Sequence, residues 1–214
     1  IVDDCSSDDS YAISREKAQN DPRIRTVRLE SRSGPAVARN TAIHMAQGRY
    51  IAFLDSDDMW LPDKLEKQLD LMKKNSVAFS YTAYEKIDVT GSRSGRCVYV
   101  PHIAYYKDLL TGCFIGCLTA VYDSQVVGKI YMPHIKRGQD YALWLKILKD
   151  GHVAQGVNEI LALYRERKGS ISSSKIKKAY SQWKIYRTLE RMPLLNAMRC
   201  FCIYGKNGLK KKLI

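Results

Sequence analysis

Short apolar runs alternate with stretches of helical apolar spacing along the first 165 residues. Apolar and polar residues alternate over 24–29, which predicts a half-buried strand. Apolar runs predict further strands at 50–54, 77–84, 115–122 and 160–164. Capping residues and helical spacing predict helices at 10–19, 36–47, 62–74 and 139–149. Strands that alternate with helices predict an α/β fold, in which a mostly parallel sheet carries helices on both faces.

Two of these segments carry more specific expectations. In the helix over 62–74, Pro62 suits the first helical position, and one face is expected to be lined by Leu65, Leu69 and Met72. The segment 85–112 lacks a clear period, so we expect it to be irregular.

Residues 166–214 differ from the 1–165 domain in charge and pattern. The last fifty residues hold 14 Lys and Arg against 2 Asp and Glu, so +12 of the net charge of +13 lies there. The pattern predicts a basic helical extension, in which Pro193 opens the second helix. Such a tail suits an anionic partner, either a membrane surface or nucleic acid, with membrane anchors at Trp183, Phe201 and Tyr204. In the alternative interpretation the tail packs on the body through the stripe of Tyr180, Trp183, Tyr186 and Leu189.

Hydropathy and cysteine usage predict a cytoplasmic protein that is soluble or peripheral to a membrane. The apolar runs are far shorter than the roughly 20 residues needed to cross a bilayer. The six cysteines have no zinc-finger spacing and are expected to be reduced thiols, with Cys113 and Cys117 buried in a strand rather than bound to a metal. The chain opens on Ile1 in the middle of an apparent strand, so we expect upstream sequence to be missing.

Three carboxylates follow the 50–54 run within four residues, namely Asp55, Asp57 and Asp58. Like charges at this spacing repel one another, and a divalent cation relieves the repulsion. Carboxylate oxygens suit hard ions such as Mg²⁺ and Mn²⁺. Because open α/β sheets bind ligands at the carboxyl ends of their strands, these residues predict a ligand site there.

Four motifs occur in order along the chain: Val2-Asp3-Asp4-Cys5-Ser6, Gly34-Pro35-Ala36-Val37-Ala38-Arg39-Asn40, Phe53-Leu54-Asp55-Ser56-Asp57-Asp58 and Gln139-Asp140-Tyr141-Ala142-Leu143-Trp144-Leu145. With these motifs, residues 1–165 resemble the family 2 glycosyltransferases of the Rossmann-like GT-A fold, among them bacterial enzymes that build lipopolysaccharide or capsule. Each motif alone is weak evidence, whereas four in this order make a specific match. The resemblance also implies that a strand and a helix precede Val2.

The resemblance implies a nucleotide-sugar donor, expected to be UDP-linked, whose diphosphate is neutralised by Mn²⁺ or Mg²⁺. Asp57, with Asp55 beside it, matches the family's metal-and-ribose motif, and Asp57 is the implied metal ligand. Asp4 matches the residue that accepts a hydrogen bond from the uracil ring. Arg39 matches a position that reaches the nucleotide or diphosphate, although it is alternatively a solvated helix residue. The role of Asp58 stays open.

Asp140 matches the general base of the family's inverting reaction, which takes the proton of the acceptor hydroxyl. Outside this set of motifs, Asp140 would be an ordinary acidic residue at a helix N-terminus. The family usually has Glu before this Asp. Here Gln139 takes that place, so the role of the additional charge is open.

The sequence therefore predicts an inverting glycosyltransferase that moves a sugar from a nucleotide donor to a hydroxyl of a lipid-linked or surface glycan, held by its tail at the inner membrane face. A haloacid-dehalogenase-like phosphohydrolase is one alternative, but its pattern requires Thr or Val where this chain has Met59. A nucleic-acid-binding protein is the other, and it would leave the acidic clusters unexplained. Nucleic acid is therefore not the expected partner.

Overall fold

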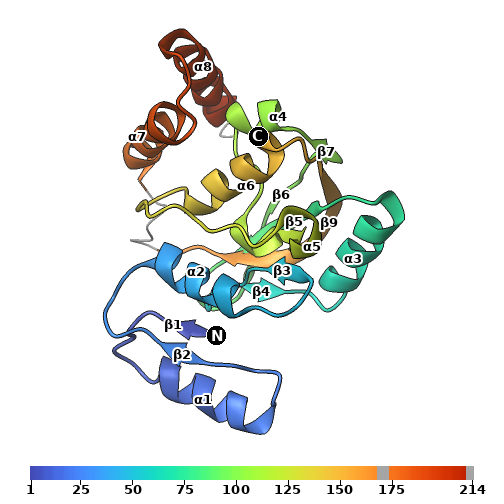
Figure 1. Cartoon of the computed structure of the whole chain (residues 1–214), viewed down its shortest axis with the longest axis vertical. Helices are drawn as coiled ribbons and strands as arrows, with labels where there is room; N and C mark the ends of the chain where they lie inside the picture. Colours follow the sequence, from blue (N-terminus) through green and yellow to red (C-terminus); the bar gives the residue numbers. More distant parts are fainter. Residues whose placement is uncertain (168–173, 211–214) are drawn as a thin grey trace.

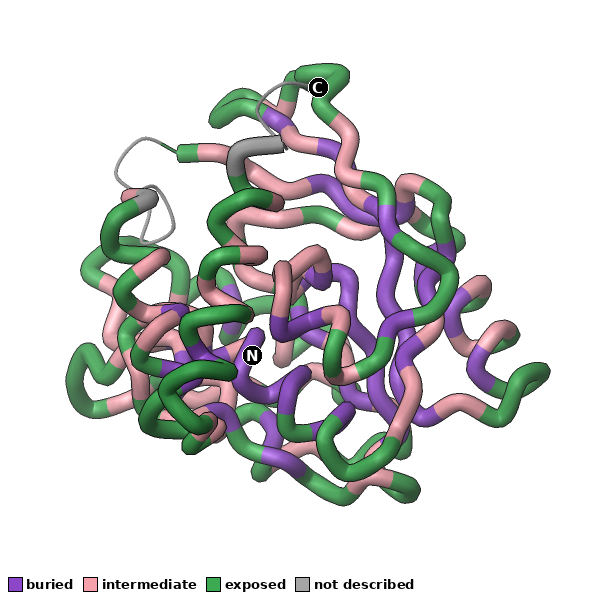
Figure 2. Tube along the Cα trace, turned by 90° about the horizontal axis from the view of Figure 1, so that it is seen from above, coloured by how far each residue is buried: buried purple, intermediate pink, exposed green. Residues whose placement is uncertain are grey.

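The computed structural model describes residues 1–167 and 174–210. Seven strands form its main sheet: β3 (Tyr50–Ala52), β4 (Met59–Trp60), β5 (Phe79–Ile87), β6 (Arg93–Val98), β7 (Ile103–Ala104), β8 (Val121–Asp123) and β9 (Ala154–Arg165). The strand order is β3-β8-β5-β9-β4, with β6 paired to β5 and β7 paired to β9. Figure 2 shows buried segments inside the molecule and exposed segments mostly toward its edges, and the central strands carry much of the hydrophobic core.

Helices cover both faces of this sheet, because neighbouring residues of a strand point to opposite sides. On one face, the Phe79 ring of β5 packs 5.0 Å from the Trp144 ring of α6 (Gln139–Lys149), centroid to centroid. On the other face, the next residue, Ser80, is hydrogen-bonded to Gln68 of α3 (Lys64–Asn75). The α/β class and the two helical layers are thus confirmed.

The sheet itself is mixed, which corrects the expectation of a mostly parallel one. In the seven-stranded sheet the β5–β9 pair is parallel, and the other pairs are antiparallel. An alternation of apolar runs and helices predicts the elements but leaves the direction of each strand open.

The segment 85–112 is ordered, so the expectation of an irregular segment was wrong. It holds the end of β5, strands β6 and β7, and the short helix α4 (Tyr106–Leu110). The turn between β5 and β6 is fixed by Asp88, whose Oδ1 accepts hydrogen bonds from the backbone N–H groups of Thr90 and Ser92. So short a turn can only join antiparallel strands.

The buried face of α3 also differs from the predicted one. Lys64, Gln68 and Met72 are buried at helical spacing, whereas Leu65 is exposed. The Gln68 amide donates to Ser80 Oγ and to the Thr119 carbonyl, and it accepts a 2.6 Å hydrogen bond from Lys64 Nζ. Polar residues can form this face because these hydrogen bonds satisfy their buried groups.

A smaller parallel pair lies at one end of the molecule (Figure 1). Strands β1 (Val2–Asp3) and β2 (Val27–Arg28) form this two-stranded sheet, and α1 (Ser10–Asn20) connects them. Strand β1 contacts α2 (Pro35–Met45), which lies against the main sheet.

The tail packs on the body at the opposite end (Figure 1). It comprises α7 (Lys175–Lys184), a π-helical turn over Ile185–Leu189 and α8 (Leu194–Lys210). Tyr186 is fully buried and its hydroxyl donates to the Leu110 carbonyl, and Asn207 donates to the Thr111 carbonyl at 2.9 Å. The packing interpretation thus holds for Tyr186, although Tyr180 and Leu189 are exposed. Within 1–167 and 174–210, no helix is both long and apolar enough to span a membrane.

Candidate active site

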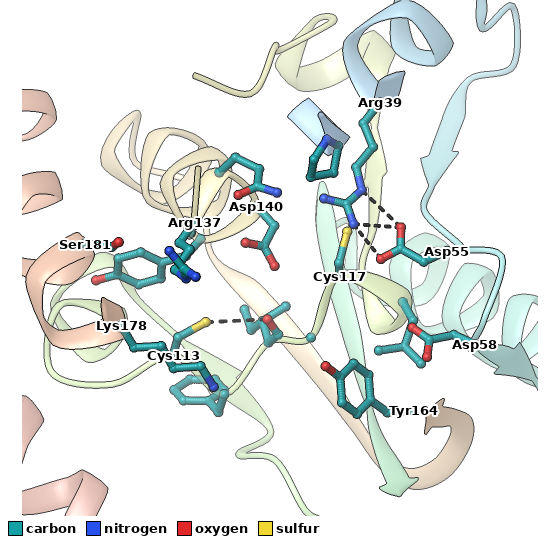
Figure 3. A pocket seen from close by; sticks show the side chains of 18 of the residues that line it. Arg39, Asp55, Asp58, Cys113, Cys117, Arg137, Asp140, Tyr164, Lys178 and Ser181 are labelled. Atoms are coloured by element: carbon teal, nitrogen blue, oxygen red, sulfur yellow. Dashed lines mark hydrogen bonds and ion pairs between the residues drawn. The ribbon is translucent and has the colours of Figure 1, made fainter. Parts of the chain in front are cut away.

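A cleft of about 790 Å³ lies between the strand-end carboxylates, the start of α6 and the tail (Figure 3). Four of the predicted site residues line it together: Arg39, Asp55, Asp57 and Asp140. They come from α2, the loop after β3 and the first turn of α6. The tail contributes Lys178, Ser181, Gln182, Ile185 and Tyr204.

Arg39 and Asp55 form an ion pair in this cleft, in which two nitrogens of Arg39 donate to the carboxylate. Arg39 Nη2 lies 2.7 Å from Asp55 Oδ1 and 2.5 Å from Oδ2, and Nε lies 3.2 Å from Oδ1. The Arg39 side chain is only 15% exposed, so the interpretation of a solvated helix residue was wrong. The bonding engages both oxygens of Asp55 and fixes the direction of the guanidinium.

Asp57 and Asp58 are held from the end of β9. Asp57 Oδ2 accepts from two nitrogens of Arg167, Nη2 at 2.6 Å and Nε at 3.0 Å. Asp58 Oδ1 accepts from the backbone N–H of Arg165 at 2.9 Å. The three neighbouring carboxylates therefore each have a separate donor.

The environment of Asp58 changes its acidity. Burial, with smaller contributions from the charges of Asp57 and Asp55, raises its pKa to about 7, although the hydrogen bond from Arg165 opposes the change. A carboxyl group with this pKa takes up or loses a proton near neutral pH.

The strand-end carboxylates fit a divalent cation that is also coordinated by a substrate. Among the described residues, no group of three or more His, Cys, Asp or Glu side chains is placed to hold a metal ion. Mg²⁺ is usually bound by one or two carboxylates plus substrate phosphates, rather than by a cage of protein ligands. Asp57 is partly exposed in the cleft and offers such a carboxylate.

Asp140 lies in the first turn of α6, with its carboxylate directed into the cleft (Figure 3). Gly138, directly before α6, has φ +75°, and a Cβ there would lie 3.0 Å from Ile185 Cδ1, so glycine lets the chain turn closely against the tail. Burial raises the pKa of Asp140, and the nearby charge of Arg39 opposes this rise. The arrangement gives a carboxylate of enhanced basicity in the cleft.

Gln139 lines the same cleft beside Asp140. The residue is 6% exposed, and its Oε1 has no hydrogen-bond partner in the part of the chain that the structure describes. A buried acceptor without a partner is unusual in a folded protein. Gln139 thus presents an open polar group next to the candidate base.

Asp4 lies outside the cleft lining. Its two oxygens accept from the backbone N–H groups of Ser33 and Gly34, at 2.7 and 2.9 Å. These bonds position the loop that leads into α2. The assignment of Asp4 to the nucleotide base stays a prediction.

The contribution of the tail to the cleft was not predicted from the sequence. Gln182 of α7 donates to the Tyr141 hydroxyl at 2.8 Å, which brings the tail against α6. Arg167 could have been noticed, because it is a basic residue three positions after the end of the predicted strand at 160–164. Cys113 and Cys117 also line the cleft, on the loop before β8 and at the start of a short 3₁₀ helix (Cys117–Thr119), and not in a strand as predicted.

The first 121 residues match the family model described as glycosyl transferase family 2. TuaG of Bacillus subtilis (strain 168), a glycosyltransferase assigned to teichuronic acid biosynthesis, is 48% identical over 213 residues, which cover 100% of this chain and 84% of TuaG. WfgD of Escherichia coli is named a UDP-Glc:α-D-GlcNAc-diphosphoundecaprenol β-1,3-glucosyltransferase. It is 42% identical over 195 residues, which cover 91% of this chain and 75% of WfgD.

Among solved structures, TarS 1–349 of S. aureus in complex with UDP-GlcNAc has a similar fold, with a TM-score of 0.71 and 18% sequence identity. The match covers 95% of this chain and 61% of the TarS chain, so this chain spans less than two thirds of that protein fragment. None of these comparisons supports the phosphohydrolase or the nucleic-acid-binding alternative.

Proposed function

The chain belongs to glycosyl transferase family 2 and has the fold expected for it, and we propose that it moves a sugar from a UDP-linked donor to a lipid-linked glycan acceptor. The observation that carries this proposal is the placement of Asp140 in one cleft with Arg39, Asp55 and Asp57. A candidate base and a candidate diphosphate site are then close enough to act on one sugar. The names of WfgD and TuaG support the donor, the acceptor class and a role in making a surface polysaccharide.

On the donor side, Arg39 directs its guanidinium at the nucleotide or the diphosphate. Its pair with Asp55 holds it in place before the donor arrives, which reduces the entropy lost on binding. Asp55 faces the ribose, and Asp4 contributes to the base pocket through the loop that it holds.

Family members typically use a divalent cation, and Asp57 is the residue that would hold it here, as Mn²⁺ or Mg²⁺. When bound, the ion would neutralise the diphosphate and stabilise it as a leaving group. Asp55 has both oxygens on Arg39, so Asp57 is the better ligand of the two.

Asp140 acts as the general base in a single displacement. It takes the proton of the acceptor hydroxyl while that oxygen bonds to the anomeric carbon, and the bond from this carbon to the nucleotide diphosphate breaks. The electron pair of the broken bond leaves with the diphosphate. One displacement inverts the configuration at the anomeric carbon.

The acceptor approaches from the tail, which would lie on the anionic inner face of the cytoplasmic membrane. The outer face of α8 carries exposed Leu194, Leu195 and Met198, and the same helix carries Arg199 and Lys206. An apolar face beside basic residues is typical of helices that lie in a membrane interface. A lipid-linked acceptor would then meet the cleft where the tail lines it.

In this proposal the outer face of α8 contacts the membrane, and the predicted anchors Trp183, Phe201 and Tyr204 do not. Trp183 and Phe201 pack edge to face with their ring centroids 5.5 Å apart, and Tyr204 lines the cleft. All three therefore pack inward.

A transfer assay tests the proposal. The wild-type chain is incubated with Mn²⁺, a panel of UDP- and GDP-sugars and a GlcNAc-diphosphoprenol acceptor, and the glycosylated lipid is measured. Asp140→Asn should lower transfer by about 10² or more with UDP binding nearly unchanged, because the amide keeps the shape and loses the basicity. Transfer by this variant at the wild-type rate would exclude Asp140 as the base.

A further inference from the structure

Arg167 is the least firmly held of the basic residues that meet the strand-end carboxylates. Its side chain is 52% exposed, and Asp57 is its partner among the described residues. Arg39 is largely buried, and the Arg165 side chain donates to the carbonyls of Asp57, Asp88 and Val89. Of the three arginines, Arg167 can therefore change partners most easily.

Its contact occupies one of the two oxygens of the carboxylate that would hold a cation. Both Arg167 nitrogens meet Asp57 Oδ2, at 2.6 and 3.0 Å. A guanidinium there repels a second positive charge and occupies the lone pairs of this oxygen. Arg167 and a divalent cation therefore compete for Asp57.

We propose that Arg167 is an exchangeable counter-ion, which neutralises Asp57 before the donor binds and turns to the donor diphosphate when donor and cation bind together. This inference rests on the proposed function, which supplies the diphosphate. The planar fork of an arginine suits two phosphate oxygens as well as a carboxylate. Arg167 would thus be a positioning residue that couples the two binding events.

The neighbouring residues keep Arg167 in reach of both partners. The backbone N–H of Arg165 is fixed by Asp58, and Glu166 pairs with Lys86 at 2.7 Å and Arg96 at 2.5 Å. The backbone is thereby anchored directly before Arg167, which itself lines the cleft. Rotation of its side chain is sufficient for the exchange.

The exchange makes cation and donor binding cooperative. Without a nucleotide, cation binding requires Arg167 to leave Asp57 without a new partner. With a diphosphate present, Arg167 gains a partner when it leaves. Each ligand should then raise the affinity of the other by the same factor, as linkage requires.

Calorimetry on the whole chain tests this inference. Mn²⁺ alone, UDP alone and UDP at saturating Mn²⁺ are titrated into the wild type, Arg167→Gln, Arg167→Lys and Arg23→Gln. In Arg167→Gln we expect tighter binding of Mn²⁺ alone, weaker binding of UDP with Mn²⁺, and a coupling factor about tenfold smaller, within the usual range of such couplings. Arg167→Lys should keep part of the coupling, since it retains the charge without the fork.

Arg23→Gln is the control, because Arg23 forms an exposed pair with Asp21 and does not line the cleft. It should leave the coupling unchanged. Wild-type coupling in Arg167→Gln would overturn the inference. Cation-independent UDP binding by the wild type would also overturn it, yet would leave the transferase proposal standing, whereas a wild type that binds no UDP would refute both.

Discussion

The guanidinium of Arg39 is held by both oxygens of Asp55, at 2.7 and 2.5 Å from Nη2. The pair connects α2 to the strand-end loop in the cleft that also contains Asp140. Arg39 also opposes the rise in the Asp140 pKa that burial causes. One arginine thus links the proposed donor site electrostatically to the proposed base.

Arg39→Gln should move the acid limb of the pH–rate profile to higher pH. Burial raises the pKa of Asp140, and removal of the opposing charge raises it further. Because the base must be deprotonated, activity would be lost at a higher pH as the solution is acidified. The profile of kcat/KM against pH reports this limb for the free enzyme.

Arg23→Gln is the control for this experiment. Arg23 pairs with Asp21 at 2.7 Å on the surface and does not line the cleft. Its profile should match that of the wild type. An unshifted limb in Arg39→Gln would show that a group other than Asp140 limits the reaction at low pH.

Gln139→Glu should shift the same limb in the same direction. A second carboxylate beside Asp140 disfavours the ionised base, so the pKa of Asp140 should rise. Gln139→Met removes the amide without adding charge and should leave the limb in place. If both variants shift the limb alike, the loss of the amide, and not the added charge, is responsible.

Asp58→Asn should stabilise the fold at pH 8. The pKa of Asp58 is raised to about 7 in the folded state, against roughly 3.9 for an unperturbed Asp. The stability from this group is therefore fully present below the unfolded pKa and is lost as the pH rises through about 7. Asparagine has no charge to desolvate and keeps the Oδ1 acceptor for the Arg165 N–H.

Thermal melts at two pH values check this prediction in buffer that contains a chelator. At pH 8 we expect a gain on the order of 1–2 kcal/mol, or about 2–8 °C in Tm for a chain of this size. Near pH 5 the gain should be much smaller, since wild-type Asp58 is then neutral in the folded state. An equal gain at both pH values would show that Asp58 is not buried as a charge at pH 8.

Local patterns made much of the fold predictable. The helix predicted at 139–149 coincides with α6, because the spacing of its apolar residues is encoded within the segment itself. The carboxylates Asp55 and Asp57 were likewise found from a strand end. The buried face of α3 was not, since Lys64 and Gln68 are buried only because partners from other elements satisfy Gln68.

The tail residues that line the cleft could not be predicted for a related reason. The charge of the tail indicated a surface segment, whereas the Gln182–Tyr141 and Tyr186–Leu110 hydrogen bonds join residues far apart in sequence. Neither composition nor periodicity contains such a pairing. In the same packing, Trp183 of α7 faces the body, and the outer face of α8 is exposed.

Leu195→Glu should weaken binding to anionic vesicles through this outer face. Leu195 is 80% exposed, so the change should leave the fold intact. Loss of one buried leucine from the interface corresponds to about 1.5–3 kcal/mol, or roughly 10- to 150-fold in affinity. Co-sedimentation with phosphatidylglycerol vesicles, at low and at high salt, measures this loss of affinity.

Val126→Glu is the matched control, because Val126 is an exposed apolar residue on α5 (Ser124–Val127), outside the tail. It adds the same negative charge and should lower binding only slightly. Trp183→Ala, by contrast, should lower the Tm with little change in vesicle affinity, because Trp183 packs against Phe201. Equal losses in Leu195→Glu and Val126→Glu would mean that net charge alone draws the protein to the membrane and that α8 does not insert its apolar face.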